Sequence, residues 1–98
     1  MDAIWVSNHG GRQLDTVRAS VDILVDVAKS VANRIKDAAR PYVFVDGGIR
    51  SGSDIFKCLA LGADYVFVGR PLVYSLVEGY EGVKRMIDLL TMELGFVM

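Results

Sequence analysis

The stretch Pro41–Phe56, PYVFVDGGIRSGSDIF, decides the fold class of this chain. Four consecutive apolar residues at 42–45, all β-branched or aromatic, are typical of a buried strand. A glycine-rich loop follows at 46–52, and Ser53 and Asp54 are residue types that can cap the helix expected after it. The strand has no polar alternation, so we expect both of its faces to be covered, as in a parallel sheet.

The same order of strand, glycine-bearing loop and helix occurs on either side of this stretch. Upstream, Ala3–Val6 predicts a strand, and 19–40 predicts a helix with apolar residues at helical spacing. Downstream, Tyr65–Val68 predicts a third strand and 72–76 a short helical turn. A final helix is predicted from its apolar face, which comprises Val83, Met86, Ile87, Leu90 and Leu94. Such alternation implies an α/β fold with a parallel sheet, in which ligands bind at the carboxyl ends of the strands.

Composition limits the classes of partner. The 98 residues suffice for one modest domain, and a hydrophobic fraction of 52% suits either buried strands or a surface that receives a partner. The 11 basic and 12 acidic residues nearly balance, so we expect no nucleic-acid or membrane binding. The single cysteine, Cys58, excludes an internal disulfide and a cysteine-based metal cage, and we expect it in the core and no metal site. Without a signal peptide or a membrane-spanning run, we expect an intracellular, cytoplasmic protein.

Two of the loops have the composition of an anion site. The loops at 46–52 and 68–71 combine glycines, which let backbone N–H groups approach a ligand, with Arg50 and Arg70, which supply forked donors. In (β/α)8 barrels, loops after the last two strands and a short extra helix often bind phosphate. The alternative is that the glycines only permit tight turns and the arginines are solvated. We favour the anion site because two such loops follow consecutive strands.

The loop after the first strand reads SNHGGRQLD, Ser7–Asp15, and holds the only histidine of the chain. Histidine titrates near neutral pH, so His9 is a candidate general base. Arg12 could bind a carboxylate through two parallel hydrogen bonds, and Ser7 could hydrogen-bond a cofactor ring. The alternative is an exposed loop histidine beside a surface arginine. Spacing alone leaves both interpretations open.

Two blocks together resemble a known family. VSNHGGRQLD, at Val6–Asp15, and VDGGIRSGSDIFKCLALGADYVFVGRP, at Val45–Pro71, are similar to the C-terminal part of the FMN-dependent 2-hydroxy-acid oxidases and dehydrogenases. The first block is specific to that family, whereas other FMN- and phosphate-binding barrels share segments like the second. The resemblance covers about residues 2–98 and implies FMN as cofactor and oxidation of a small 2-hydroxy acid to a 2-oxo acid.

The resemblance also implies a role for each candidate residue. His9 would be the active-site base, Arg12 would bind the substrate carboxylate, and Ser7 would lie close to the flavin. The remaining residues would surround the FMN phosphate and ribityl chain: Asp46, Gly48, Arg50, Gly69 and Arg70. The resemblance leaves two routes open for this reaction, hydride transfer and passage through a carbanion, and the sequence does not distinguish them.

The length of the chain departs from the family pattern. A complete (β/α)8 barrel needs about 250 residues, and this chain resembles only the last three βα units. We therefore expect a partial TIM barrel, with residues 1–98 forming a single C-terminal part-barrel in an open three-layer arrangement around three parallel strands. Its exposed edges predict self-association or pairing with an N-terminal part-barrel, and no activity from the isolated chain. Two alternatives are a phosphate- or flavin-binding module without catalysis and a structural assembly fragment.

Overall fold

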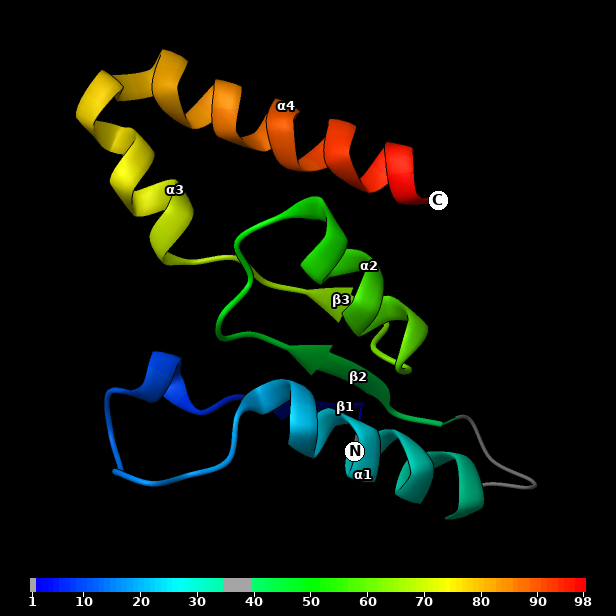
Figure 1. Ribbon diagram of the computed structural model, residues 1–98. Helices are drawn as coiled ribbons and strands as arrows, with labels where there is room; N and C mark the ends of the chain where they lie inside the picture. The colour runs from blue at the N-terminus through cyan, green and yellow to red at the C-terminus, as the bar shows by residue number, and fades with distance from the viewer. Residues whose placement is uncertain (1, 35–39) are drawn as a thin grey trace.

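A computed structural model of the chain describes residues 2–34 and 40–98, and strands and helices alternate along it (Figure 1). The elements in chain order are β1 (Ala3–Val6), the 3-10 helix η1 (His9–Gly11), α1 (Ser20–Arg34), β2 (Tyr42–Val45), α2 (Gly52–Ala60), β3 (Tyr65–Val66), α3 (Arg70–Ser75), the 3-10 helix η2 (Leu76–Glu78) and α4 (Gly79–Val97). The predicted α/β fold with three βα units is confirmed. The part of the first predicted helix at 35–39 lies outside the described residues.

The three strands form one parallel sheet in the order β1-β2-β3. The register pairs Phe44, in the central strand, with Trp5 on one side and Tyr65 on the other. β3 ends before the predicted Val68, because β2, its only partner among the described strands, already turns into a loop after Val45. Because the strands are parallel, the loops that follow them lie at one edge of the sheet.

The two faces of the sheet differ. One face packs against α1 and α2, which lie in front of the strands in Figure 1. The buried residues of that core are Val6, Leu24, Val31, Val43, Val45, Ile49, Cys58 and Ala63. The opposite face is aromatic: Trp5 and Tyr65 are 55% and 54% exposed, and the Phe44 ring lies against both, with centroids 5.9 and 5.4 Å apart.

The predictions of two covered strand faces and of three layers are therefore wrong for the described residues. The sheet carries helices on one face only, so the arrangement has two layers. The reason is that a continuous apolar strand specifies two apolar faces but does not specify what covers them. Here the second face is filled by rings that contact one another.

Helix α2 begins earlier than the sequence predicts. Ser51, and not Ser53, is the N-cap: its hydroxyl accepts a hydrogen bond from the Asp54 N–H at 3.2 Å. The Asp54 carboxylate in turn accepts one from the Arg50 N–H at 3.0 Å. This reciprocal pair resembles a capping box and fixes the direction in which the glycine-rich loop enters the helix.

The last helix, α4, packs on α2 and on α3 and not on a strand face. Figure 1 shows α4 running above α2, with α3 joining it to the sheet edge. Gly52 makes the close approach possible, because a Cβ there would lie 2.2 Å from the Leu94 nitrogen in α4. Leu90 is buried as expected, whereas Ile87, predicted on the same apolar face, is 49% exposed. The wide apolar stripe on α4 is therefore only partly used within the described residues.

An ion pair joins the amino ends of the second and third βα units. Two Arg40 nitrogens donate to the Asp64 carboxylate, which also accepts a hydrogen bond from the Val43 N–H at 2.8 Å. The Arg40 hydrogen bonds lower the pKa of Asp64 from its ordinary value, and desolvation opposes this shift. The pair lies at the edge of the sheet opposite the glycine-rich loops and stabilises the frame that holds them.

Candidate functional site

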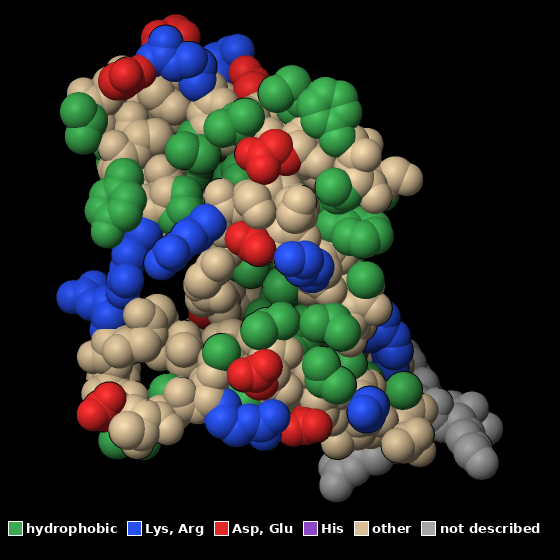
Figure 2. Space-filling model, in the orientation of Figure 1, with side chains coloured by type: hydrophobic (Ala, Val, Ile, Leu, Met, Phe, Trp, Pro, Cys, Tyr) green, Lys and Arg blue, Asp and Glu red, His purple; other side chains and the backbone are tan. Residues whose placement is uncertain are grey.

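A cleft of about 1310 Å³ opens at the carboxyl edge of the sheet. It is hollowed between the η1 region below and α3 and α4 above, and blue basic side chains gather at its mouth in Figure 2. All three loops singled out in the sequence line it. The predicted site residues that line it are His9, Arg12, Asp46, Gly48, Arg50, Gly69 and Arg70.

The turn that carries His9 is left-handed. His9, Gly10 and Gly11 have φ values of 56°, 63° and 74°, which is uncommon for a residue with a Cβ such as His9. The Gly11 N–H donates to the Asn8 carbonyl at 3.0 Å and closes the turn. The glycine pair therefore has a conformational reason, and the turn brings the histidine to the wall of the cleft.

Ser7 does not have a free hydroxyl. Its Oγ donates to the Asp46 carboxylate at 2.5 Å and accepts a hydrogen bond from the His9 N–H at 3.0 Å. The other Asp46 oxygen accepts from the Trp5 indole N–H at 3.0 Å. Trp5, a residue of β1, thus fixes this carboxylate from the neighbouring strand. Strands β1 and β2 are thus joined at their carboxyl ends by side chains.

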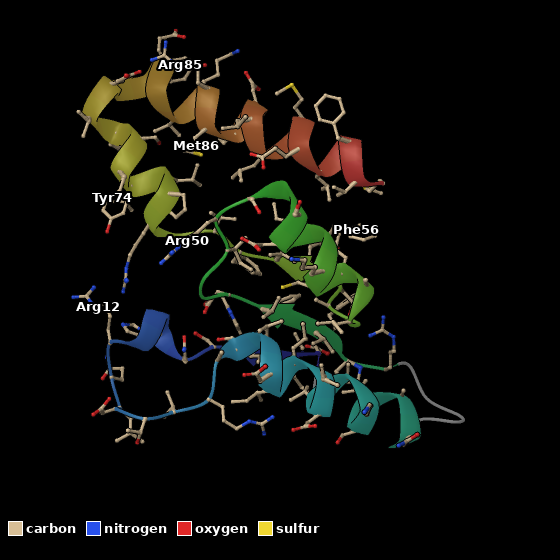
Figure 3. All side chains as sticks on the ribbon, in the orientation of Figure 1. Arg12, Arg50, Phe56, Tyr74, Arg85 and Met86 are labelled. Carbon is tan, nitrogen blue, oxygen red and sulfur yellow. The ribbon has the colours of Figure 1, made fainter. Side chains whose placement is uncertain are left out.

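The loop between β2 and α2 forms the back of the cleft. Gly47 and Gly48 have φ values of 97° and 77°, so both need the freedom of glycine. A Cβ at Gly47 would lie 2.9 Å from the Asn8 Oδ1, whereas Gly48 faces open space. Backbone at Gly48 is therefore accessible to a ligand at close range. Figure 3 shows Arg50, from this loop, on the same open side of the molecule as Arg12.

The loop after β3 reaches across the cleft to the histidine turn. Arg70 begins α3, and its Nη2 donates to the Gly10 carbonyl at 3.0 Å. This contact ties the third loop to the first. Gly69 has no atom within 4 Å of the place where a Cβ would stand, so its backbone is also open to the cleft.

The charge of the cleft favours an anion. Four basic side chains line it, from Arg12, Arg50, Lys57 and Arg70, against the two carboxylates of Asp46 and Asp54. Both carboxylates are already occupied by hydrogen bonds. Among the described residues, the guanidinium groups of Arg12 and Arg50 have no hydrogen-bond or ion-pair partner. The excess of positive charge and the open glycine backbone can hold a phosphate or a carboxylate.

Cys58 lies at the inner wall of the cleft and is 2% exposed. Burial raises the pKa of its thiol, and the nearby Asp54 charge adds to the shift. A thiol with a raised pKa is a poor nucleophile, so Cys58 is a core residue, as predicted.

The sequence reasoning missed Lys57, which lines the cleft, and two residues beneath the histidine turn, Asn8 and Ser20. Asn8 has a buried Oδ1 without a hydrogen-bond partner among the described residues, and its N–H donates to the Ser20 hydroxyl at 3.2 Å. Ser20 is only 3% exposed. Ser20 reads in the sequence as an ordinary residue near a helix start, so only its burial beneath the turn identifies it.

Among residues 2–34 and 40–98, no group of three His, Cys, Asp or Glu side chains could hold a metal ion. Over the same residues, no helix is both long enough and apolar enough to cross a membrane.

Comparisons with known proteins point to one family. The family model described as FMN-dependent dehydrogenase matches residues 1–98. The chain is 48% identical to 2-Hydroxyacid oxidase 2 of Rattus norvegicus over 95 residues, which cover 96% of this chain and 25% of that protein. It is also 48% identical to a protein of Arabidopsis thaliana named Peroxisomal (S)-2-hydroxyacid oxidase GLO3, covering 100% of this chain and 26% of that protein.

A solved structure of a flavocytochrome b2 mutant superposes with a TM-score of 0.89 at 41% identity, over 99% of this chain and 25% of that one. The chain thus spans about a quarter of the length of the relatives it matches. The shared fold extends over nearly the whole chain, including all three loops of the cleft.

Proposed function

Because the chain belongs to the FMN-dependent dehydrogenase family, we propose that it forms the phosphate-binding and base-bearing part of an FMN site that oxidises small 2-hydroxy acids to 2-oxo acids. The observation that carries this proposal is the convergence of three loops on one basic cleft. The relatives are named as oxidases of 2-hydroxy acids, and the chain spans about a quarter of their length. The activity of a whole protein of this kind is therefore part of the proposal.

The residues of the cleft fit the phosphate end of FMN. The open backbone at Gly48 and Gly69 and the guanidinium groups of Arg50 and Arg70 would hold the phosphate. Arg70 uses one nitrogen for the Gly10 carbonyl and has further N–H donors for a ligand. Each Asp46 oxygen accepts one hydrogen bond, so a second lone pair on each could accept from a ribityl hydroxyl.

The substrate would bind at the histidine turn. Oxidation of a 2-hydroxy acid removes two electrons and two protons, and bound FMN supplies the acceptor for the electrons. Arg12 would grip the carboxylate and orient the substrate, and His9 would take a proton from it as general base. Because His9 and Arg12 flank one short turn, they hold two groups of the same small molecule.

A flavin titration tests the phosphate part of this proposal. We expect the 98-residue chain to quench FMN fluorescence on binding and to bind riboflavin, which lacks the phosphate, much more weakly. Arg50→Ala and Arg70→Ala should each weaken FMN binding about tenfold, as expected for loss of a charge-assisted contact. Arg18→Ala removes an equal charge that pairs with Asp26 on α1 and should leave binding unchanged. Equal affinity for FMN and riboflavin would contradict the phosphate assignment.

Co-expression with an N-terminal part-barrel of a related oxidase tests the catalytic part. Restored yellow colour and turnover of glycolate or lactate with an artificial electron acceptor are expected. His9→Asn should keep the colour and abolish turnover, whereas Arg12→Ala should mainly raise KM. A yellow complex without turnover would instead favour a flavin-binding module without catalysis.

The aromatic face of the sheet favours a second candidate, a structural assembly unit. Trp5, Tyr42 and Tyr65 are each more than half exposed on one continuous face, which is unusual for a surface in water. We propose that residues 1–98 are a C-terminal part-barrel and that this face pairs with an N-terminal part-barrel or with a second copy. Sedimentation of the chain as a compact monomer would count against self-association.

We also propose a cytoplasmic location for the protein. Cell fractionation tests this proposal against the peroxisome, which the name of the Arabidopsis relative gives for that protein.

A further inference from the structure

We infer that Asp46 and Ser7 are positioning residues for His9, and that Trp5 fixes Asp46 in this task. The inference deepens the proposed function, because it concerns the residue expected to act as the base. It rests on a continuous chain of hydrogen bonds from Trp5 through Asp46 and Ser7 to the His9 backbone.

The first step is that the conformation of His9 requires support. A φ of 56° lies in the left-handed region, where a side chain crowds the backbone, and such residues persist only where their surroundings determine them. The two glycines that follow make the turn possible but do not select it, since glycine populates many conformations. Contacts from outside the turn must therefore hold His9.

The second step is that three different elements contact the turn. The Ser20 hydroxyl, at the start of α1, accepts from the Asn8 N–H, and Arg70, at the start of α3, donates to the Gly10 carbonyl. Within the turn, the His9 carbonyl accepts from the Arg12 N–H at 3.2 Å. Among the described residues, the side chain that bonds to His9 is Ser7, whose hydroxyl accepts from the His9 N–H at 3.0 Å. The residues on either side of His9, Asn8 and Gly10, are thus held by α1 and α3, and His9 is held by the Ser7 side chain.

The third step is that Asp46 aims the Ser7 hydroxyl. A serine hydroxyl rotates freely unless its proton has an acceptor. Donation to Asp46 Oδ1 at 2.5 Å, a distance typical of O–H···O⁻ bonds, turns a lone pair of Ser7 Oγ toward the His9 N–H and makes that oxygen a better acceptor. Asp46 directly follows β2 and Ser7 directly follows β1, so the position of the base depends on the register of these two strands.

The fourth step is that Trp5 fixes the carboxylate. Its indole N–H donates to Asp46 Oδ2 at 3.0 Å, and its ring lies against Phe67 with centroids 4.6 Å apart. The two oxygens of Asp46 are therefore assigned to two different partners. Phe67 directly follows β3. Residues at the carboxyl ends of all three strands therefore help to hold the base.

Nuclear magnetic resonance of the 98-residue chain without flavin tests the inference. The chain has one histidine, so isotope labelling of histidine alone identifies the Cα, Cβ and amide signals of His9. We expect Ser7→Ala and Asp46→Ala to move the His9 Cα and Cβ shifts away from left-handed values. Amide exchange at His9 should accelerate about two- to tenfold, the range expected for loss of one hydrogen bond. Trp5→Phe, which keeps a ring but loses the N–H, should produce a smaller change in the same direction.

Conservative variants separate positioning from a general loss of structure. Ser7→Thr keeps the hydroxyl and Asp46→Asn keeps an acceptor oxygen, so both should restore the His9 signals. Asp26→Ala removes an exposed carboxylate on α1 and should have no effect. If the Asp46→Ala variant does not fold, the Ser7→Ala variant still tests the inference, because Ser7 is exposed and its loss should not prevent folding. Wild-type His9 signals in Ser7→Ala would overturn the inference. The resonance experiment contains no flavin, so its result does not depend on FMN binding. If the flavin titration failed instead, the proposed function would be overturned and the result for His9 would still stand.

Discussion

Replacing Gly52 by alanine tests the packing of α4 on the rest of the molecule. Gly52 is the first residue of α2, directly after the N-cap Ser51. An added Cβ would lie 2.2 Å from the Leu94 nitrogen, 2.5 Å from the Glu93 Cβ and 2.6 Å from the Glu93 carbonyl carbon. Two of these three atoms belong to backbone inside a helix. They cannot turn away as the end of a flexible side chain can, so α2 and α4 must separate.

The expected magnitude follows from two opposing effects. Inserting a methyl group into a closely packed site costs about 1–3 kcal/mol. Alanine recovers roughly 0.5–1 kcal/mol through its better helix propensity. Because the added Cβ would lie as close as 2.2 Å to backbone, the insertion cost falls in the upper part of that range, about 2–3 kcal/mol. The net loss in the free energy of unfolding is therefore about 1–2.5 kcal/mol, which lowers Tm by roughly 4–20 °C for a domain of this size.

Urea unfolding followed by circular dichroism measures this change, with Gly95→Ala as the matched control. Gly95 lies in α4, and no atom stands within 4 Å of its Cβ position. The same substitution there should leave stability unchanged or raise it by up to about 1 kcal/mol. A Gly52→Ala variant as stable as the wild type, with the same m-value, would show that α4 does not pack on α2 as described.

Two further substitutions and one labelling experiment test other parts of the structure. Asp64→Asn should destabilise the chain by about 1 kcal/mol at pH 7 through its bonds to Val43 and Arg40. Since the folded pKa of Asp64 is lowered, this contribution is present above the unfolded pKa near 3.9 and is lost as the pH falls through the folded value. Urea midpoints of the two proteins should therefore converge as the pH falls through the folded pKa of Asp64, and a difference that stays constant with pH would contradict the ion pair. Leu24→Ala, at a fully buried position, should cost about 2–5 kcal/mol by the same assay, and a loss under 1 kcal/mol would refute its place in the core. Cys58 should react with a thiol reagent only on unfolding, because burial raises its pKa, so rapid native labelling at pH 7 would show that the cleft wall is open.

The strands and loops were predictable because local patterns encode them. Short runs of apolar, mostly β-branched or aromatic residues at Ala3–Val6 and Tyr42–Val45 are typical of strands, and the glycines after them indicate turns. The alternation of strands and helices fixes the parallel order, and parallel order places all the loops at one edge. The gathering of His9, Arg50 and Arg70 at one cleft therefore follows from the sequence pattern.

Element ends and caps were less predictable. Ser51 and Ser53 are equally good caps by residue type, and only the hydrogen bond from the Asp54 N–H selects Ser51. Likewise the end of β3 depends on where its partner β2 stops, which is a property of the pair and not of either sequence. Local sequence leaves such choices nearly equal in energy.

By itself, the sequence determined the α/β alternation, the edge at which a ligand would bind and the residue types that would meet it, because these depend on short-range periodicity. Only the tertiary structure decided that the sheet carries helices on one face and leaves its aromatic face exposed. Only the tertiary structure, too, joined Trp5 and Asp46 across 41 positions of the chain. Hydrogen bonds between side chains of neighbouring strands depend on register, and register is set by the packing of the whole sheet.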